Sequence, residues 1–213
     1  MNKEQELIRC KTIIVGDSGV GKTSIIGRYI NKFNVNEKST IGASFTNKVE
    51  KINDKELIFE IWDTAGQERF RSINNIFYQD SYICIMVYDI TNRNSFNSLK
   101  DYWYNAVKEY GPQGIIFHVA GNKIDLFEEE EVDRNDVKEY CESIDCEYSF
   151  ISATENTFID ELFKKIGEKF LNSDIYKNLE QNKKNNKSQI FAIEDDEEDK
   201  KNSKNKNKNK KCC

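Results

Sequence analysis

Gly16-Asp17-Ser18-Gly19-Val20-Gly21-Lys22-Thr23 decides the fold, because this stretch fits G-x-x-x-x-G-K-[ST], the pattern of a phosphate-binding P-loop. Residues 11–15 before it predict a short buried strand, and residues 24–31 after it predict a helix. Gly16 and Gly21 permit backbone angles and a close phosphate approach that a Cβ would block. The flanking strand and helix oppose the alternative, a chance match in a glycine-containing loop.

The end of this stretch carries the chemistry of phosphate binding. Backbone N–H groups of the loop and of the helix N-terminus face a bound anion. Lys22 can reach the β- and γ-phosphates, and the Thr23 hydroxyl can ligate Mg²⁺. We therefore expect the residues from Gly16 to Ser24 to bind a nucleoside phosphate, with Mg²⁺ as cofactor. The stretch alone does not distinguish ATP from GTP.

Strand-like and helix-like segments alternate from residue 9 to about 171, which predicts a doubly wound α/β sheet. Strands are predicted at 9–15, 44–52, 56–62, 82–89, 115–120 and 147–151, and helices at 22–31, 95–110, 132–142 and 157–171. The strands at 44–52 and 56–62 alternate apolar and polar residues around Asn53-Asp54-Lys55, a hairpin signal. Motifs that follow strand ends should converge at one edge of the sheet.

The composition indicates one globular domain and a tail. The 213 residues carry a net charge of −5, and residues 174–213 hold eleven Lys against eight Asp and Glu, so the body is acidic and opposes non-specific nucleic-acid binding. We expect a flexible N-terminus at 1–8, a domain at 9–173 and a disordered tail at 174–213. The first residues lack the apolar core of a signal peptide, which favours a cytosolic chain with reduced thiols.

Asn122-Lys123-Ile124-Asp125 follows a predicted buried strand and resembles the guanine-recognition motif of small GTPases. Guanine presents N1–H and N2–H₂ on one edge, and the Asp125 carboxylate can accept both, whereas adenine leaves it unpaired. Lys123 can lie along the base, and Asn122 can tie this loop to the P-loop. Ile151-Ser152-Ala153-Thr154 resembles the S-A-K loop of the same proteins, with Thr154 in place of Lys. The resemblance implies that the Ala153 amide faces the guanine oxygen.

Asp63-Thr64-Ala65-Gly66-Gln67-Glu68 follows the predicted strand at 56–62. Asp63 is placed to hold Mg²⁺, through a water, and Gly66 can offer its amide to the γ-phosphate. Gln67 can orient the attacking water, because its amide both donates and accepts. The resemblance implies two further contacts: Thr40 binds Mg²⁺ and senses the γ-phosphate, and Phe33 packs against guanine.

Together these segments resemble a Rab-type small GTPase over residues 9–171, which implies a P-loop NTPase fold with a six-stranded, mostly parallel sheet flanked by helices. The specific marks are Ile41-Gly42-Ala43-Ser44-Phe45, Arg69-Phe70-Arg71-Ser72-Ile73 and Val87-Tyr88-Asp89-Ile90-Thr91. The resemblance implies effector contacts by an aromatic triad, together with the loop before it: Phe45, Trp62 and Tyr78, with Ile41 and Gly42. The segment at 77–81 departs from the usual Y-Y-R-G-A.

The implied activity is hydrolysis of GTP to GDP and phosphate, with Gln67, Lys22 and Gly66 as catalytic groups. No arginine finger is evident in the sequence, so we expect slow turnover that a GTPase-activating protein accelerates about 10³–10⁵-fold. Ser18 stands where many relatives have Gly, and we expect its side chain to crowd the transition state. It therefore leaves open one alternative, a GTP-holding scaffold that barely hydrolyses, which Gln67 and Asp63 oppose. The other alternative, an ATP-dependent kinase or ATPase, is opposed by Asn122 to Asp125.

The chain ends in Cys212-Cys213, which resembles the doubly geranylgeranylated end of Rab proteins. Two lipid chains anchor a protein stably, and seven Lys between residues 200 and 211 can add attraction to an anionic leaflet. A nucleic-acid-binding tail is the rival interpretation. The resemblance implies an exchange factor, an activating protein, a GDP-dissociation inhibitor, prenylation machinery and effectors as partners. It also implies the cytoplasmic face of an intracellular membrane with a cytosolic pool, and residues 41–45 favour the endosomal branch.

Overall fold

The computed structural model describes residues 7–34, 40, 42–66 and 71–182, and for residues 71–74 it describes the backbone alone. The chain divides into two units, residues 1–170 and 171–213. Within the described part, no helix is both long enough and apolar enough to cross a membrane.

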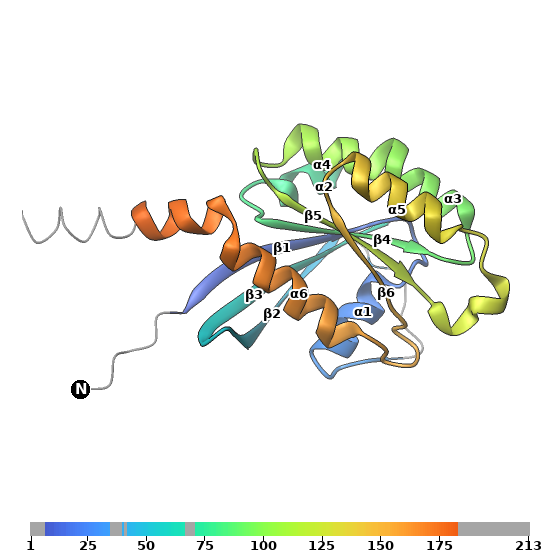
Figure 1. The fold of residues 1–213 in the computed structure, drawn as a ribbon, viewed down its shortest axis with the longest axis horizontal. Helices are drawn as coiled ribbons and strands as arrows, with labels where there is room; N and C mark the ends of the chain where they lie inside the picture. Colours follow the sequence, from blue (N-terminus) through green and yellow to red (C-terminus); the bar gives the residue numbers. More distant parts are fainter. Residues whose placement is uncertain (1–6, 35–39, 41, 67–70, 183–213) are drawn as a thin grey trace, which may run out of the picture. The chain divides into compact units, whose positions relative to one another are not determined.

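A six-stranded sheet forms the centre of the first unit, with strand order β2-β3-β1-β4-β5-β6 (Figure 1). Five strands run parallel, and β2 pairs antiparallel with β3, which confirms the predicted sheet. The bounds are β1 Ile8–Val15, β2 Ala43–Ile52, β3 Lys55–Thr64, β4 Ile83–Asp89, β5 Ile116–Asn122 and β6 Glu147–Phe150. All seven residues of β4 are buried, as expected for a parallel strand covered on both faces.

The hairpin between β2 and β3 is tighter than the sequence pattern indicates. Ile52 pairs with Lys55, so Lys55 belongs to β3 and the turn consists of two residues. Asn53 and Asp54 have φ of 48° and 62°. Positive φ at both central positions is the type I′ geometry, which Asn and Asp tolerate and which matches the twist of the strands.

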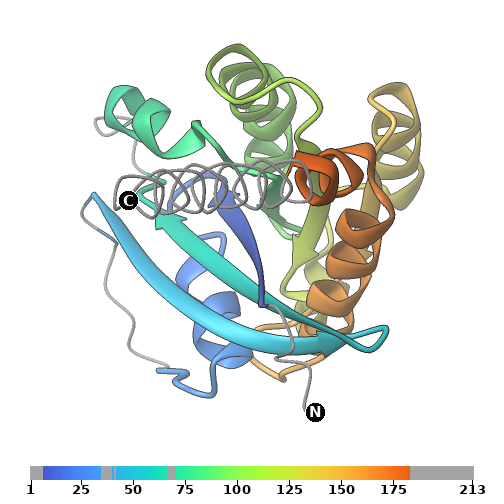
Figure 2. The ribbon, with the colours of Figure 1, turned by 90° about the vertical axis from the view of Figure 1, so that its left-hand side faces the viewer.

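Helices cover both faces of the sheet (Figures 1 and 2). One face carries α1 (Lys22–Tyr29) and α6 (Ile159–Asn172). The other face carries α2 (Arg71–Tyr78), α3 (Arg93–Ser98), the π-helix η2 (Leu99–Trp103), α4 (Tyr104–Tyr110) and α5 (Arg134–Ser143). A 3₁₀ segment, η3 (Ile124–Glu129), follows β5.

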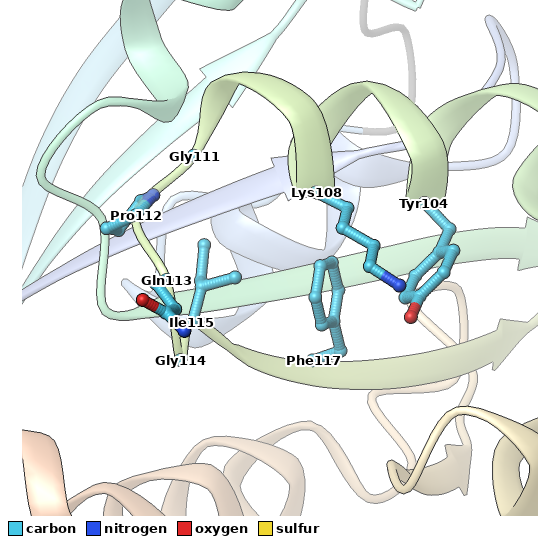
Figure 3. Close-up of a pocket in the computed structure, with 8 residues that line it drawn as sticks. All are labelled: Tyr104, Lys108, Gly111, Pro112, Gln113, Gly114, Ile115 and Phe117. Carbon is cyan, nitrogen blue, oxygen red and sulfur yellow. The ribbon is translucent and has the colours of Figure 1, made fainter.

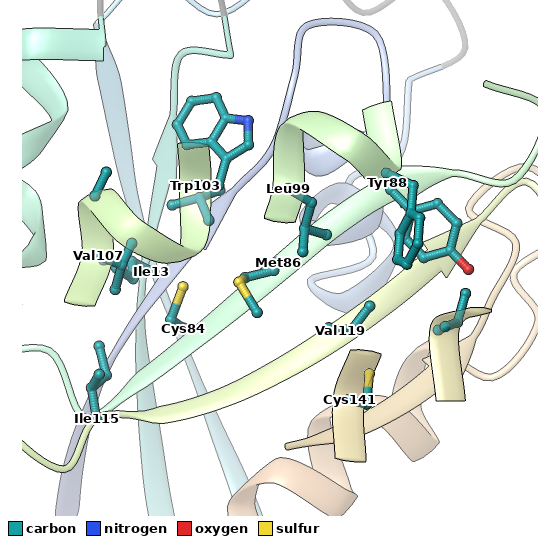
Figure 4. Close-up of a cluster of buried hydrophobic side chains, with 14 of the residues drawn as sticks. Ile13, Cys84, Met86, Tyr88, Leu99, Trp103, Val107, Ile115, Val119 and Cys141 are labelled. Atoms are coloured by element: carbon teal, nitrogen blue, oxygen red, sulfur yellow. The ribbon is translucent and has the colours of Figure 1, made fainter. Parts of the chain in front are cut away.

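Aromatic and aliphatic side chains fill the space between helices and sheet. On the α1 and α6 face, Tyr29 stacks on Phe163 with ring centroids 3.6 Å apart, and both meet Phe59 edge-on. On the opposite face, Leu99 and Trp103 lie over strand side chains that include Met86 (Figure 4). Burial of each such side chain contributes roughly 1.5–3 kcal/mol, so these two layers hold the sheet between its helices.

The helices differ from the prediction in three places. The single helix predicted at 95–110 is two α-helices joined by a π-turn, which an apolar spacing of three and four residues does not reveal. Helix α2 was not predicted, because its sequence lacks a cap signal. In the second unit, residues 174–182 are helical where a disordered tail was expected, and the rest of that predicted tail lies outside the described residues.

Candidate functional site

The P-loop leaves β1 at the carboxyl edge of the sheet and requires glycine at two positions. Gly16 has φ +143°, and a Cβ there would lie 2.2 Å from the Val87 carbonyl oxygen. Gly21 has φ +97°, and a Cβ there would lie 2.3 Å from Asn122 Nδ2. Both contacts are closer than atoms can approach, so the predicted glycine requirement has a physical cause in the neighbouring strand ends.

Lys22 begins α1 and folds back over the loop. Its Nζ donates to the carbonyl oxygens of Gly16 and Asp17, each at 2.8 Å. Burial lowers the pKa of Lys22 from 10.5 to about 8, while the charges of Asp63 and Asp17 oppose this shift. A buried ammonium with carbonyl partners suits an incoming phosphate, whose charge favours the protonated form.

Three oxygen ligands meet beside Lys22. Thr23 Oγ1 donates to Asp63 Oδ2 at 2.6 Å, and the hydroxyls of Thr23 and Thr40 are 2.9 Å apart. Thr40 Oγ1 lies 3.3 Å from the same Asp63 oxygen. Ligands around an octahedral Mg²⁺ are about 3 Å from one another, since Mg–O distances are about 2.1 Å. The all-oxygen donor set therefore fits Mg²⁺, whereas the described residues hold no group of three His, Cys, Asp or Glu suited to a metal.

Gly66, at the end of the β3 loop, lies against the P-loop. A Cβ at Gly66 would lie 2.5 Å from both the Asp17 carbonyl carbon and Lys22 Nζ. The backbone of residue 66 therefore approaches the place where Lys22 would meet a terminal phosphate. The structure thus brings together Lys22, Thr23, Thr40, Asp63 and Gly66.

Asn122, at the end of β5, bonds to the P-loop and to the loop at 152–154. The bond to the P-loop agrees with the prediction. Asn122 Nδ2 donates to the Val20 carbonyl at 2.8 Å, and its Oδ1 accepts from the Ala153 N–H at 3.0 Å. The side chain is 2% exposed. One amide thus fixes the loop at 152–154 against the phosphate-binding loop.

Asp125 and Lys123, which we expect to contact the base, are each bound by a neighbouring polar side chain. Ser152 Oγ donates to Asp125 Oδ1 at 2.5 Å, and Lys123 Nζ lies 2.5 Å from Asp89 Oδ2. Lys123 adopts φ 71°, which turns the chain out of β5 into η3. The carboxylate and the lysine stem are therefore pre-oriented beside each other.

Sequence reasoning missed Arg28 and Asp89. Arg28 Nε donates to the Ala153 carbonyl at 2.6 Å, its Nη2 donates to the Thr154 carbonyl, and its guanidinium lies 3.4 Å from the centroid of Phe33. A cleft of about 290 Å³ opens here, lined by Arg28, Asn31, Phe33 and Asn156. The sequence could have indicated Asp89, since it also ends a buried strand at this edge. No sequence pattern indicated Arg28.

The predicted aromatic triad needs a correction at Tyr78. Phe45 is 51% exposed and lies with its ring centroid 5.2 Å from that of Trp62. Tyr78 is 0% exposed, because it lies on the inner side of α2, so it is not part of the exposed aromatic surface. Its neighbour Phe77 instead lies 5.2 Å from Trp62 between ring centroids. The aromatic surface is therefore Phe45, Trp62 and Phe77.

Several predicted residues fall outside the described part of the chain. These are Ile41, Gln67, Arg69, Phe70, Cys212 and Cys213. Gly42 is described, and its carbonyl accepts from the Ala65 N–H at 2.9 Å, which links the loop after Thr40 to the end of β3.

A second cavity, of about 330 Å³, lies away from this edge (Figure 3). It is lined by α4 side chains, the loop at 111–115 and Phe117 near the start of β5. Asn122 ends the same strand, so this cavity lies at the opposite end of β5 from the P-loop. It is separate from the candidate nucleotide site.

Comparison with known proteins agrees with this geometry. Residues 11–172 match the model of the Ras family. The Ras-related protein Rab-31 of Rattus norvegicus is 43% identical over 169 residues, which cover 79% of this chain and 86% of the relative. Human Rab-22A is 41% identical, with 77% and 84% covered, and Rab-7a of Paramecium octaurelia is 40% identical, with 74% and 79% covered. The chain therefore belongs to the Ras family, as a Rab-type small GTPase that binds guanine nucleotide, hydrolyses GTP and acts in membrane trafficking.

Proposed function

We propose that this site works as a timed switch in which the residues at the carboxyl edge have separate roles. The convergence of Thr23, Thr40 and Asp63 within 3.3 Å of one another, beside Lys22, is the observation that carries the proposal. These three oxygens would hold Mg²⁺, directly or through water, and the ion would supply charge that stabilises the phosphates. Lys22 binds the β- and γ-phosphates, and the Gly66 amide donates to the γ-phosphate.

In this proposal Gln67 orients the water that attacks the γ-phosphate in line. Loss of the γ-phosphate removes a contact from both Thr40 and Gly66, so the segments at 33–45 and 64–80 loosen after hydrolysis. A matched test compares Gln67→Leu with wild type in single-turnover hydrolysis, with and without an activating protein. We expect GTP binding to persist and stimulated hydrolysis to fall sharply. Unchanged hydrolysis in the variant would remove Gln67 from the catalytic role.

Ser18 bears on the rate of that reaction. Wild-type hydrolysis that stays undetectable even with an activating protein would favour the scaffold alternative. Ser18→Gly serves as the companion variant, because it removes the one side chain in the P-loop that we expect to crowd the transition state. Recovery of hydrolysis in Ser18→Gly would place the block at this position.

We propose that Asp125 selects guanine. Its carboxylate, held by Ser152 Oγ at 2.5 Å, accepts from N1–H and N2–H₂ of the base. Asp125→Asn replaces one acceptor with a donor, which suits xanthine, a base with N1–H and an acceptor oxygen at C2. We expect this variant to lose GDP affinity and gain affinity for xanthosine diphosphate. Competition by ADP against labelled GDP tests the ATP alternative in the same assay.

We propose the exposed face of β2 and β3 as the effector surface. Phe45 and Trp62 lie on adjacent strands, and Phe77 extends the row from α2. Gly42 and Ile41 lie at the start of this face in the sequence. Phe45→Ala should abolish capture of GTP-dependent partners and leave nucleotide affinity unchanged, because the Phe45 side chain is 51% exposed and packs against Trp62.

We propose further that residues 9–173 are the GTP-binding domain and that the tail at 174–213 anchors it through geranylgeranyl groups on Cys212 and Cys213. The specific partners would be an exchange factor, an activating protein, a GDP-dissociation inhibitor and the prenylation machinery, and the compartment would be endosomal, with a cytosolic pool. Mass spectrometry of the C-terminus from cells, with a tagged chain imaged alongside Cys212→Ser/Cys213→Ser, tests this. Unmodified thiols would refute the anchor.

A further inference from the structure

Trp103 reaches from the helical layer to the P-loop. Its Nε1 donates to Asp17 Oδ1 at 2.9 Å, across 86 residues of sequence. The indole is 0% exposed and belongs to the buried hydrophobic cluster on this face of the sheet (Figure 4). Asp17 is only half-buried. The roles proposed above make no use of this contact.

Asp17 occupies the point where the two phosphate-contacting groups meet. Its carbonyl oxygen accepts from Lys22 Nζ at 2.8 Å. A Cβ at Gly66 would lie 2.5 Å from the Asp17 carbonyl carbon, so the backbone of residue 66 rests directly on this peptide. A rotation of the Asp17 peptide would therefore move the Lys22 amine and displace the Gly66 backbone together.

The π-turn η2 sets the position of the indole. The Tyr104 N–H donates to the Leu99 carbonyl, five residues back, in place of the usual four. The Asn105 amide donates to the carbonyl oxygens of Lys100 and Asp101, at 3.3 and 3.1 Å, which supports carbonyls at the turn. π-turns are less favourable than α-turns and recur at functional sites. Here the turn ends at Trp103, the residue that contacts the P-loop.

We propose that Trp103 is a positioning residue for GTP hydrolysis. Its N–H holds the Asp17 carboxylate, and this hydrogen bond fixes the Asp17 peptide so that Lys22 and Gly66 face the γ-phosphate in the reactive geometry. The inference rests on the proposed roles of Lys22 and Gly66. In this proposal Trp103 acts through Asp17, without contact to the nucleotide or the attacking water.

Trp103→Phe tests the proposal, because it removes the N–H and keeps an aromatic ring. In the full-length protein we expect single-turnover GTP hydrolysis to fall about 10-fold or more, as displacement of reacting groups by about 1 Å costs up to about 100-fold. Phe96→Leu is the matched control, since it removes volume from the same core cluster. Thermal denaturation places both variants on one stability scale. A rate loss in Trp103→Phe no larger than that in Phe96→Leu would overturn the proposal.

Variants at Asp17 separate positioning from packing. Asp17→Asn keeps an acceptor for the indole, although a neutral acceptor gives a weaker bond than a carboxylate, so it should hydrolyse GTP faster than Asp17→Ala. Asp17→Ala should be as slow as Trp103→Phe, and the double variant should be no slower than either single one. Additive losses in the double variant would overturn the proposal.

The indole N–H gives a readout that needs no core substitution. In ¹⁵N-labelled full chain, which has two Trp, we expect the Trp103 indole resonance to show slow hydrogen exchange that Asp17→Ala abolishes and Asp17→Asn preserves. Protection that survives Asp17→Ala would overturn the contact. Absence of GTP hydrolysis by wild-type protein would instead refute the proposed roles at the site and leave the contact itself standing.

Discussion

Replacement of Asn122 by Ala should weaken nucleotide binding and speed the dissociation of GDP. The side chain donates to the Val20 carbonyl at 2.8 Å and accepts from the Ala153 N–H at 3.0 Å, in a place where it is 2% exposed. Ala can make neither bond. The P-loop and the loop at 152–154 then lose their common partner, and each must be held by the nucleotide alone.

The size of the effect follows from the two backbone groups that lose this partner. A buried polar group left without a hydrogen bond costs about 1–3 kcal/mol, so two such groups cost about 2–6 kcal/mol. A water in the space vacated by the amide would offset part of this cost, which leaves about 2–4 kcal/mol. At about 1.4 kcal/mol per factor of ten, GDP affinity should fall about 30- to 700-fold.

The measurement is the dissociation rate of a fluorescent GDP analogue from full-length protein with unlabelled GDP in excess. Asn135→Ala is the matched control, because Asn135 is exposed on α5 and its side chain lies outside the site. We expect the control to match wild type. Asn122→Asp should fail to restore tight binding, since a carboxylate can accept from Ala153 but cannot donate to Val20. A dissociation rate of Asn122→Ala within 3-fold of wild type would refute the reasoning.

Three further predictions follow from single contacts. Gly66→Ala should reduce the preference for GTP over GDP, measured by competition binding, because the new Cβ would lie 2.5 Å from Lys22 Nζ; an unchanged ratio would contradict it. Burial lowers the pKa of His118 from 6.5 to about 3. Between these pH values the imidazole is protonated in the unfolded state only. The free energy of unfolding therefore falls, by at most about 1.4 kcal/mol per pH unit, as the pH drops from 6.5. Urea unfolding of His118→Gln should show a shallower fall over that range, and identical slopes would rule the histidine out. Tyr88→Phe should raise the free energy of unfolding by about 1 kcal/mol, since the buried Tyr88 hydroxyl has no hydrogen-bond partner among the described residues; equal or lower stability would count against this account.

Motif position and strand polarity together made much of the site predictable. Thr23 follows β1 and Asp63 lies at the end of β3, and these strands pair in parallel, so both residues had to lie at one edge. Asn122 ends β5 at the same edge, and the resemblance to the guanine-recognition motif had suggested its tie to the P-loop. The fold class and the positions of the strand ends were enough to predict that these residues converge.

The contacts that the sequence could not reveal are those between side chains whose spacing follows no rule. Arg28 contacts the loop at 153–154 because α1 passes beneath it, and an arginine in the last turn of a helix is common for other reasons. The aromatic surface was misassigned at Tyr78 for a related reason. Without the helix α2 in the prediction, the sequence gives no basis for deciding which of Phe77 and Tyr78 faces outward.

Because η2 is a π-turn, this part of the helical layer contains one residue more than a regular α-helix needs. Five residues, Leu99–Trp103, occupy a turn that an α-helix closes with one fewer. Removal of one exposed residue there, such as Asp101, would let α3 and α4 merge into a continuous helix, with Phe96, Leu99 and the indole still three or four residues apart. The inward face of α4 would keep its orientation, and only the side chains within the turn itself would shift. The chain can therefore change length by one residue at this point, at the cost of re-aiming the side chain that reaches the phosphate loop.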